Sequence, residues 1–168
     1  MRESVALRTE AYYRAVANEA LKRIDCGEPP VPIDDLIAAL GIPVRPVNLP
    51  DFFMAALVYE DGLPVMVINW AKPEYERRRA LAHMLGHVLL VLHGEDESFP
   101  RDAGDHREAD LVARELMMPM QMVIEQARLW FNDFRYLARL FGVSEETMLE
   151  RMREMGLVRG PQGVVWDY

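Results

Sequence analysis

The apolar residues of this chain recur with two different periods, and the change of period separates predicted helices from predicted strands. Over residues 8–24, apolar side chains repeat every four positions, which predicts an amphipathic helix. The residues on that face are Tyr12, Val16, Ala20 and Ile24. A second, shorter helix is predicted over Ile33 to Leu40, because Gly41 follows it as a carboxyl-terminal cap.

The middle of the chain changes to short β-rich runs, which are IPVRPVNL, FFMAALVYE and LPVMVINW. The last two flank the turn sequence Glu60-Asp61-Gly62, as the strands of a hairpin do. We therefore predict a small antiparallel sheet of about three strands. We also expect LPVMVINW to form an exposed edge that takes an extended peptide by β-addition.

After Pro73 the helical period returns, and it predicts helices over residues 73–93, 105–117, 120–130, 133–141 and 145–156. The sequence GVVWDY closes the chain as a further predicted strand. A few strands followed by a run of helices indicate an α+β fold. The 168 residues contain no repeat and no long linker, so we expect a single domain.

Charge and composition narrow the classes of partner. The formal net charge of -8 argues against broad affinity for nucleic acid or anionic membrane, since both present negative charge. The single cysteine, Cys26, fits a reducing compartment. The first residues, MRESVALRTE, lack the apolar segment of a signal peptide, and the run from Ala80 to Leu92 is shorter than the roughly 20 residues that span a bilayer. We expect a cytoplasmic protein.

Two histidines stand four residues apart in the apolar sequence 77-RRRALAHMLGHVLLVLH-93. One helical turn places the rings of His83 and His87 on the same face, where both can reach one metal ion at about 2.0–2.1 Å. Gly86 leaves room for another backbone to pass close to this helix. The alternative is a helix with two hydrogen-bonded core histidines and no metal. The three arginines at its start, Arg77, Arg78 and Arg79, are expected to be solvated, apart from an ion pair to Glu74 or Glu76. The alternative for this run is a contact with a peptide carboxylate.

A second histidine-bearing helix follows, 106-HREADLVARELMMP-119. Asp110 stands one turn after His106, where its carboxylate can accept a hydrogen bond from the non-coordinating nitrogen of a first-helix histidine and fix its tautomer. Glu108 is the competing third ligand, but it lies about 200° round the helix from His106. Its i+4 neighbour is Val112, which offers no such carboxylate. We therefore predict His106 as the third ligand of a zinc ion that keeps an open position.

In combination and order, these segments resemble the ImmA/IrrE family of metallopeptidases. The resemblance covers residues 30 to 158 and includes the sheet region, RRRALAHMLGH, HREADLVARELMMP and the helix-turn-helix-like YLARLFGVSEETMLERMREMGL. It implies a zinc-peptidase scaffold with a metal-site core over 30–130 and a helix-turn-helix-like subregion over 131–158. It also implies a regulatory role, because family members cut helix-turn-helix repressors.

The first departure from the family's pattern is at the general base. The histidines of the family's H-E-x-x-H motif correspond to His83 and His87, and its catalytic glutamate corresponds to Met84. Methionine has no titratable group, and loss of a positioned general base typically costs about 10²–10⁴ in rate. We therefore expect peptide hydrolysis to be weak or lost, unless Glu108 acts as a substitute base.

The second departure is at the third ligand. The family usually has a glutamate there, in a stretch like E-x-E-A-N, and it corresponds to His106. Glu108 then matches the inner glutamate and Asp110 the final position. Three neutral histidines leave zinc its full charge, which partly compensates for the missing base.

The segment 133–157 has the pattern of a DNA-reading unit, but its second helix carries four glutamates against Arg151 and Arg153. Phosphate would repel the net negative charge of this helix, so we interpret the unit as a packing module or as a surface for the partner protein. Two further hypotheses stay open. One is a pseudo-peptidase that only binds its partner, which suits Met84 as an apolar plug. The other is an interaction protein without metal.

Overall fold

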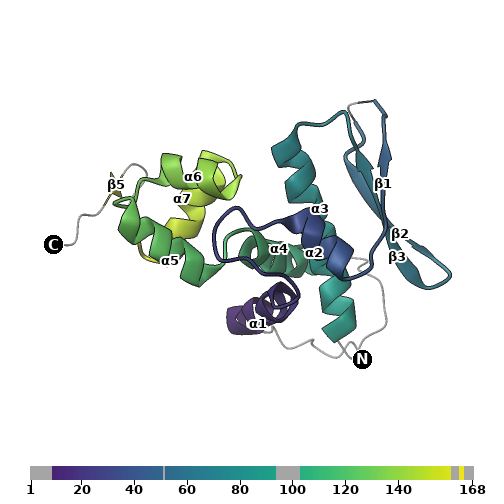
Figure 1. The fold of residues 1–168 in the computed structure, drawn as a ribbon, viewed down its shortest axis with the longest axis horizontal. Coiled ribbons are helices and arrows are strands. Elements are labelled where there is room, and N and C mark those ends of the chain that lie inside the picture. Colours follow the sequence, from purple (N-terminus) through teal and green to yellow (C-terminus); the bar gives the residue numbers. More distant parts are fainter. Residues whose placement is uncertain (1–8, 51, 94–102, 160–162, 165–168) are drawn as a thin grey trace.

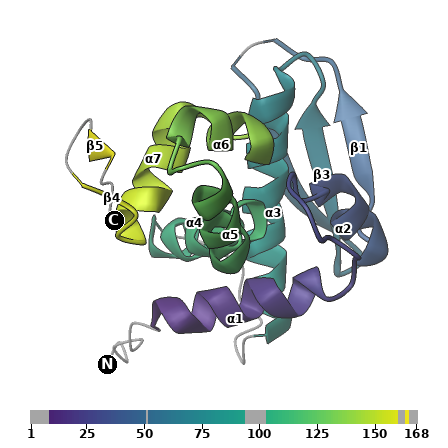
Figure 2. The ribbon, with the colours of Figure 1, turned by 60° about the vertical axis from the view of Figure 1, so that its left-hand side comes forward.

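The computed structural model describes residues 9–50, 52–93, 103–159 and 163–164. A small sheet forms one side of the molecule, and helices form the rest (Figure 1). The long helix α3 (Glu74–His93) lies between the sheet and α4 (Ala103–Met117), as Figure 2 shows from a second direction. The predicted α+β class is confirmed. Among the described residues, no helix has the length and apolar character needed to cross a bilayer.

The sheet has three strands, as predicted, but it is mixed rather than wholly antiparallel. Its strands are β1 (Val44–Val47), β2 (Ala55–Glu60) and β3 (Leu63–Asn69), in the order β1-β3-β2. The hairpin β2–β3 is antiparallel, with Ala55 opposite Ile68, whereas β1 runs parallel to β3. The chain from β1 to β2 passes the end of β3 and places β1 on its other side. The prediction that LPVMVINW is an exposed edge is therefore wrong, because β3 pairs on both sides and β2 is an edge.

The loop that enters β2 is held by one buried side chain, Asn69, at the end of β3. Its amide nitrogen donates to the carbonyl oxygens of Phe53 at 2.7 Å and Leu49 at 3.1 Å. Its amide oxygen accepts from the backbone nitrogens of Leu49 and Ala71. One amide therefore replaces the missing backbone pairing of the loop and fixes where β2 begins.

The amino-terminal helices cover the histidine-bearing pair. Helix α1 (Glu10–Leu21) packs on α4, and α2 (Ile33–Ala39) packs on α3. Both were predicted, with ends displaced by a few residues. Helix α3 is buried over most of its second half because it is covered from the sheet side and from the α4 side, so its apolar residues are not confined to one stripe.

The carboxyl-terminal helices are α5 (Met120–Leu129), α6 (Phe134–Phe141) and α7 (Glu145–Glu154). The side chain of Asp133 caps α6 and that of Ser144 caps α7, each accepting a backbone N–H at 3.1 Å. Gly142 ends α6 with a φ of 69°, which favours glycine. The predicted pair of helices with a tight turn is confirmed.

Two short strands lie after α7, β4 (Val158–Arg159) and β5 (Gly163–Val164), and they pair antiparallel. Strand β4 was not predicted. The first two residues of the predicted strand GVVWDY form β5, and residues 165–168 lie outside the described residues.

A buried ion pair attaches α7 to α4. Glu115 and Arg151 are 4% and 3% exposed, and the Arg151 guanidinium donates to the Glu115 carboxylate and to the Met118 carbonyl oxygen. Burial lowers the pKa of Arg151, and the charge of Glu115 opposes that shift. Counting Arg151 as a surface cation was wrong. The exposed face of α7 is therefore more acidic than the sequence suggested.

Candidate metal centre

Helices α3 and α4 come into backbone contact at Gly86, which is buried in α3. A β-carbon built at position 86 would overlap the backbone carbonyl oxygen of Ala109 on α4. Glycine is therefore the residue that lets the two backbones meet at this level. His83 and His87 flank Gly86, so the close approach brings both of them to the helix that carries His106.

Three imidazole nitrogens converge at this level. The Nε2 atoms of His83 and His87 are 3.0 Å apart, and the Nδ1 atom of His106 lies 3.3 Å and 3.2 Å from them. The group could hold a metal ion, since one ligand atom from each residue lies within 4.8 Å of the others. His87 is buried, His83 is partly buried and His106 is exposed, so the group opens to solvent on one side.

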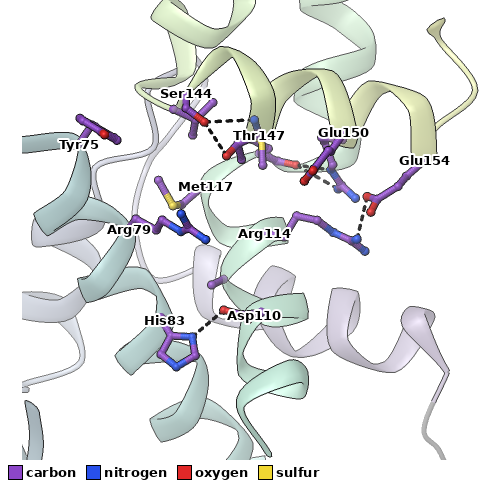
Figure 3. Close-up of a pocket in the computed structure, with 14 residues that line it drawn as sticks. Tyr75, Arg79, His83, Asp110, Arg114, Met117, Ser144, Thr147, Glu150 and Glu154 are labelled. Atoms are coloured by element: carbon purple, nitrogen blue, oxygen red, sulfur yellow. Dashed lines mark hydrogen bonds and ion pairs between the residues drawn. The ribbon is translucent and has the colours of Figure 1, made fainter. Parts of the chain in front are cut away.

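Asp110 lies beside this group, one turn after His106, as expected from the sequence. Its carboxylate lies 2.7 Å from Nδ1 of His83 (Figure 3). A proton on that nitrogen leaves Nε2 of His83 as the atom with a free lone pair, and Nε2 is the atom that faces the other two histidines. The contact therefore sets both the tautomer and the direction of the ring.

Glu108, the alternative third ligand, lies elsewhere on α4. Its carboxylate accepts a hydrogen bond of 2.7 Å from the hydroxyl of Tyr13 on α1. Among the described residues it is not a member of the histidine group. The helical arrangement separates Glu108 from His106, as the angle of about 200° between them predicts.

Met84 is 5% exposed and lines the cavity beside His83. This cavity, which we call the sheet-side arm, is lined on the sheet side by Met54 and Ala55, where β2 begins. An uncharged thioether thus stands where the family's motif has a carboxylate. The side of the histidine group that faces β2 therefore has an apolar wall.

A second cavity lies on the other side of His83, and we call it the α7-side arm. It is lined by Met117 of α4 and by Val143, Thr147 and Glu150 from the start of α7 and the turn before it (Figure 3). Four residues line both arms: Tyr75, Arg79, His83 and Asp110. The two arms form a cleft that passes His83, and this is the member of the histidine group that lines both of them. Sequence reasoning missed the α7 wall as part of this cleft, and it considered a peptide contact for Arg77, Arg78 and Arg79 only as an alternative, although Arg79 precedes His83 by one helical turn.

Comparisons with known proteins agree on the fold. The peptidase M78 family model, described as the IrrE N-terminal-like domain, matches residues 37–153. A Mycobacterium tuberculosis transcriptional regulator has a similar structure, with a TM-score of 0.59 and 20% sequence identity. The likeness covers 93% of this chain and 49% of that one, so the chain spans about half the length of that regulator. No curated protein matches the sequence.

Proposed function

Because the chain belongs to the peptidase M78 family, whose model matches residues 37–153, we propose that it is a zinc-binding, peptidase-like regulatory protein. It acts on a helix-turn-helix repressor, and its peptide hydrolysis is weak or lost. Zinc is held by His83, His87 and His106, and Asp110 orients His83. The observation that carries this proposal is the convergence of three imidazole nitrogens within 3.3 Å of one another.

The spacing of these nitrogens fits zinc. Tetrahedral ligands at about 2.0–2.1 Å lie roughly 3.3–3.4 Å from one another. The observed separations of 3.0–3.3 Å are close to that value. Hydrogen bonds among the three imidazole nitrogens cannot give each of them a partner at once, because each proton can join only two of the three. Neutral imidazole is a ligand that zinc prefers, and three protein ligands leave a position open.

When bound, zinc supplies a Lewis acid that lowers the pKa of a coordinated water. At the position where the family's motif has its general base, this chain has no group that can move protons. Met84 has none, and Asp110 is engaged with His83. Glu108 remains the candidate substitute base, but its hydrogen bond to Tyr13 holds it on the α1 side of α4. These contacts support hydrolysis that is about 10²–10⁴ slower than with a positioned base.

The regulatory role is supported by the family and by the cleft. Two arms extend from His83, one toward β2 and the other toward α7, which suits a bound polypeptide better than a small molecule. The edge strand β2 begins beside the sheet-side arm, so an extended peptide can pair with it. The structurally similar protein is a transcriptional regulator, and a repressor as partner fits that context.

Zinc content per purified chain tests the metal site. We expect about one zinc in the parent protein and in Glu108→Ala, and none in His106→Ala. Zinc in His106→Ala with loss in Glu108→Ala would instead make Glu108 the ligand. If the parent protein holds no zinc even after zinc is supplied, the result would support the alternative hypothesis of an interaction protein without metal.

Turnover of a repressor substrate tests the chemistry. We expect cleavage by Met84→Glu to be about 10²–10⁴ faster than by the parent protein. Equal rates would contradict a crippled enzyme. Binding of the repressor with no cleavage by the parent would favour the pseudo-peptidase, which uses the cleft only to hold its partner.

A further inference from the structure

Three consecutive arginines begin α3, and the structure gives them different environments. The Arg77 side chain donates to the carbonyl oxygens of Trp70 and Lys72 and lies over the Trp70 ring. The Arg78 side chain is half-buried and donates to the carbonyl oxygen of Val31 at 2.6 Å. The expectation that all three are solvated is therefore wrong for these two. Arg79 is exposed, and within the described residues it has no hydrogen bond or ion pair.

Arg79 points into the cleft. Residues 79, 83 and 87 are spaced by four, so Arg79 shares the face of α3 that carries His83 and His87. Its side chain reaches into the α7-side arm above the contact of His83 with Asp110 (Figure 3). It also lines the sheet-side arm. In the part of the chain that the structure describes, the Arg79 guanidinium has no ion pair, and it stands one helical turn from His83, a proposed zinc ligand.

None of the carboxylates that the structure describes in the lining of the cleft forms an ion pair with Arg79. Asp110 contacts His83, and Glu154 pairs with Arg114 at 2.7 Å. Glu76 and Glu150 are the remaining acidic residues of the lining, and within the described residues neither forms an ion pair with Arg79. Figure 3 places Glu150 on α7, across the cavity from Arg79.

At position 84 this chain has methionine in place of the family's glutamate, so the wall of the sheet-side arm lacks that negative charge. A glutamate at position 84 would place an anion in the wall of the sheet-side arm, which Arg79 also lines. That anion would repel an acidic ligand and compete for the guanidinium. With methionine there, the proposed zinc ion and Arg79 face the cleft, and no carboxylate among the described residues forms an ion pair with Arg79.

We propose that Arg79 and the metal held by the three histidines together bind a carboxylate of the partner polypeptide. The inference rests on the proposed zinc site and names the chemistry that this site recognises. A planar guanidinium offers paired N–H donors that match the two oxygens of a carboxylate, and zinc accepts carboxylate oxygen as a ligand. The carboxylate comes from an aspartate or glutamate side chain or from a chain end.

The test uses full-length protein loaded with Co²⁺ in place of zinc, because the visible spectrum of Co²⁺ changes when its ligands change. Acetate is the first probe. Two short peptides then distinguish the sources: one with an amidated end and a single glutamate, the other uncharged except for its terminal carboxylate. An uncharged, amidated peptide is the blank. Metal content is measured for every variant before titration.

We expect acetate and at least one acidic peptide to change the spectrum, and the peptide that binds identifies the source. Arg79→Gln should weaken this binding about 10-fold or more, as loss of a charge-assisted hydrogen bond does. Met84→Glu should weaken it at least as much. Arg139→Gln removes an exposed arginine of α6 that lines neither arm, and it should bind like the parent protein.

If the metal-loaded protein binds none of the carboxylate probes, this inference is overturned and the zinc site stands. The same holds if Arg79→Gln binds the probes as tightly as the parent protein does. Equal binding by Met84→Glu would also contradict it, because the added anion would then have no effect. Protein that takes up no metal would overturn the proposed function and this inference together.

Discussion

Along α4, His106 and Asp110 in the first half face α3, whereas Glu115 in the second half faces α7. In the second half, the carboxylate of Glu115 is buried and finds its partners within the chain, a guanidinium and a backbone N–H. The first half is open: three imidazole nitrogens face one another, and one of these histidines, His83, lines the cleft. Polar residues with all partners supplied by the chain hold the fold together, whereas converging donors that lack a complement indicate a ligand.

The largest effect is expected from the closed half. Glu115→Gln leaves the buried guanidinium of Arg151 without its counter-ion, which should cost about 3–5 kcal/mol of unfolding free energy. Denaturant unfolding measures this loss. The folded fraction should still bind one zinc, because the histidines do not depend on the ion pair.

Two further variants check this assignment. Glu154→Gln removes a more exposed partner of Arg114 and should cost only about 0–1 kcal/mol. Replacing the pair together, with Glu115→Leu and Arg151→Met, should recover much of the lost stability. A loss as large in Glu154→Gln as in Glu115→Gln would contradict the contrast between the buried and exposed pairs.

The open half should add to the free energy of unfolding only when it holds zinc. With free zinc at about 100 times its dissociation constant, the parent protein should gain about 2.7 kcal/mol in unfolding free energy. His106→Ala should lose this gain and, without zinc, unfold like the metal-free parent. Denaturant curves with zinc and with a chelator compare the two proteins. A large loss in metal-free His106→Ala would mean that this histidine is part of the structural core.

Gly86→Ala should disturb both halves, since it forces α3 and α4 apart. We expect a loss of about 1–3 kcal/mol from overpacking, together with weaker zinc binding. Gly27→Ala is the matched control, because a β-carbon at position 27 meets no atom within 4 Å. Thermal unfolding and zinc titration measure the two effects. Unchanged zinc affinity in Gly86→Ala would show that the helix spacing does not set the site.

The smallest expected effect is that of Asp110→Asn. The amide keeps the shape but removes the charged acceptor of His83, so zinc affinity should fall about 10–100-fold with little change in metal-free stability. Competition with a chromophoric chelator measures the affinity. Arg107→Gln, at an exposed position near the start of the same helix, should leave it unchanged.

Much of the local structure could be predicted because it depends on neighbours in the sequence. The spacing of His83 from His87 and of His106 from Asp110 follows from helix geometry alone, and so does the separation of Glu108 from His106. The structure brings the three histidines together and places Asp110 against His83. Helix ends were predicted where a cap was visible, as at Asp133 and Gly142.

What could not be predicted depends on which distant segments pair. Alternating residues describe the two faces of a strand but not its neighbours, so the position of β3 between β1 and β2 was missed. The same holds for Glu115 and Arg151, which lie 36 residues apart. A weak signal was present, because each stands among buried apolar residues of its own helix. Charge at such a position usually has a partner, but the sequence does not say where.

Gly86 also determines how far apart the two histidine-bearing helices, α3 and α4, lie. Two helices in contact through a bare backbone cannot move closer, and the packing on both sides resists their separation. The separation of the two backbones that carry the histidines is then set before any ion arrives. Calcium, which prefers six to eight oxygen ligands at about 2.3–2.6 Å, would not suit three nitrogen donors. A single hydrogen atom in place of a side chain thus lets the histidines of two different helices meet.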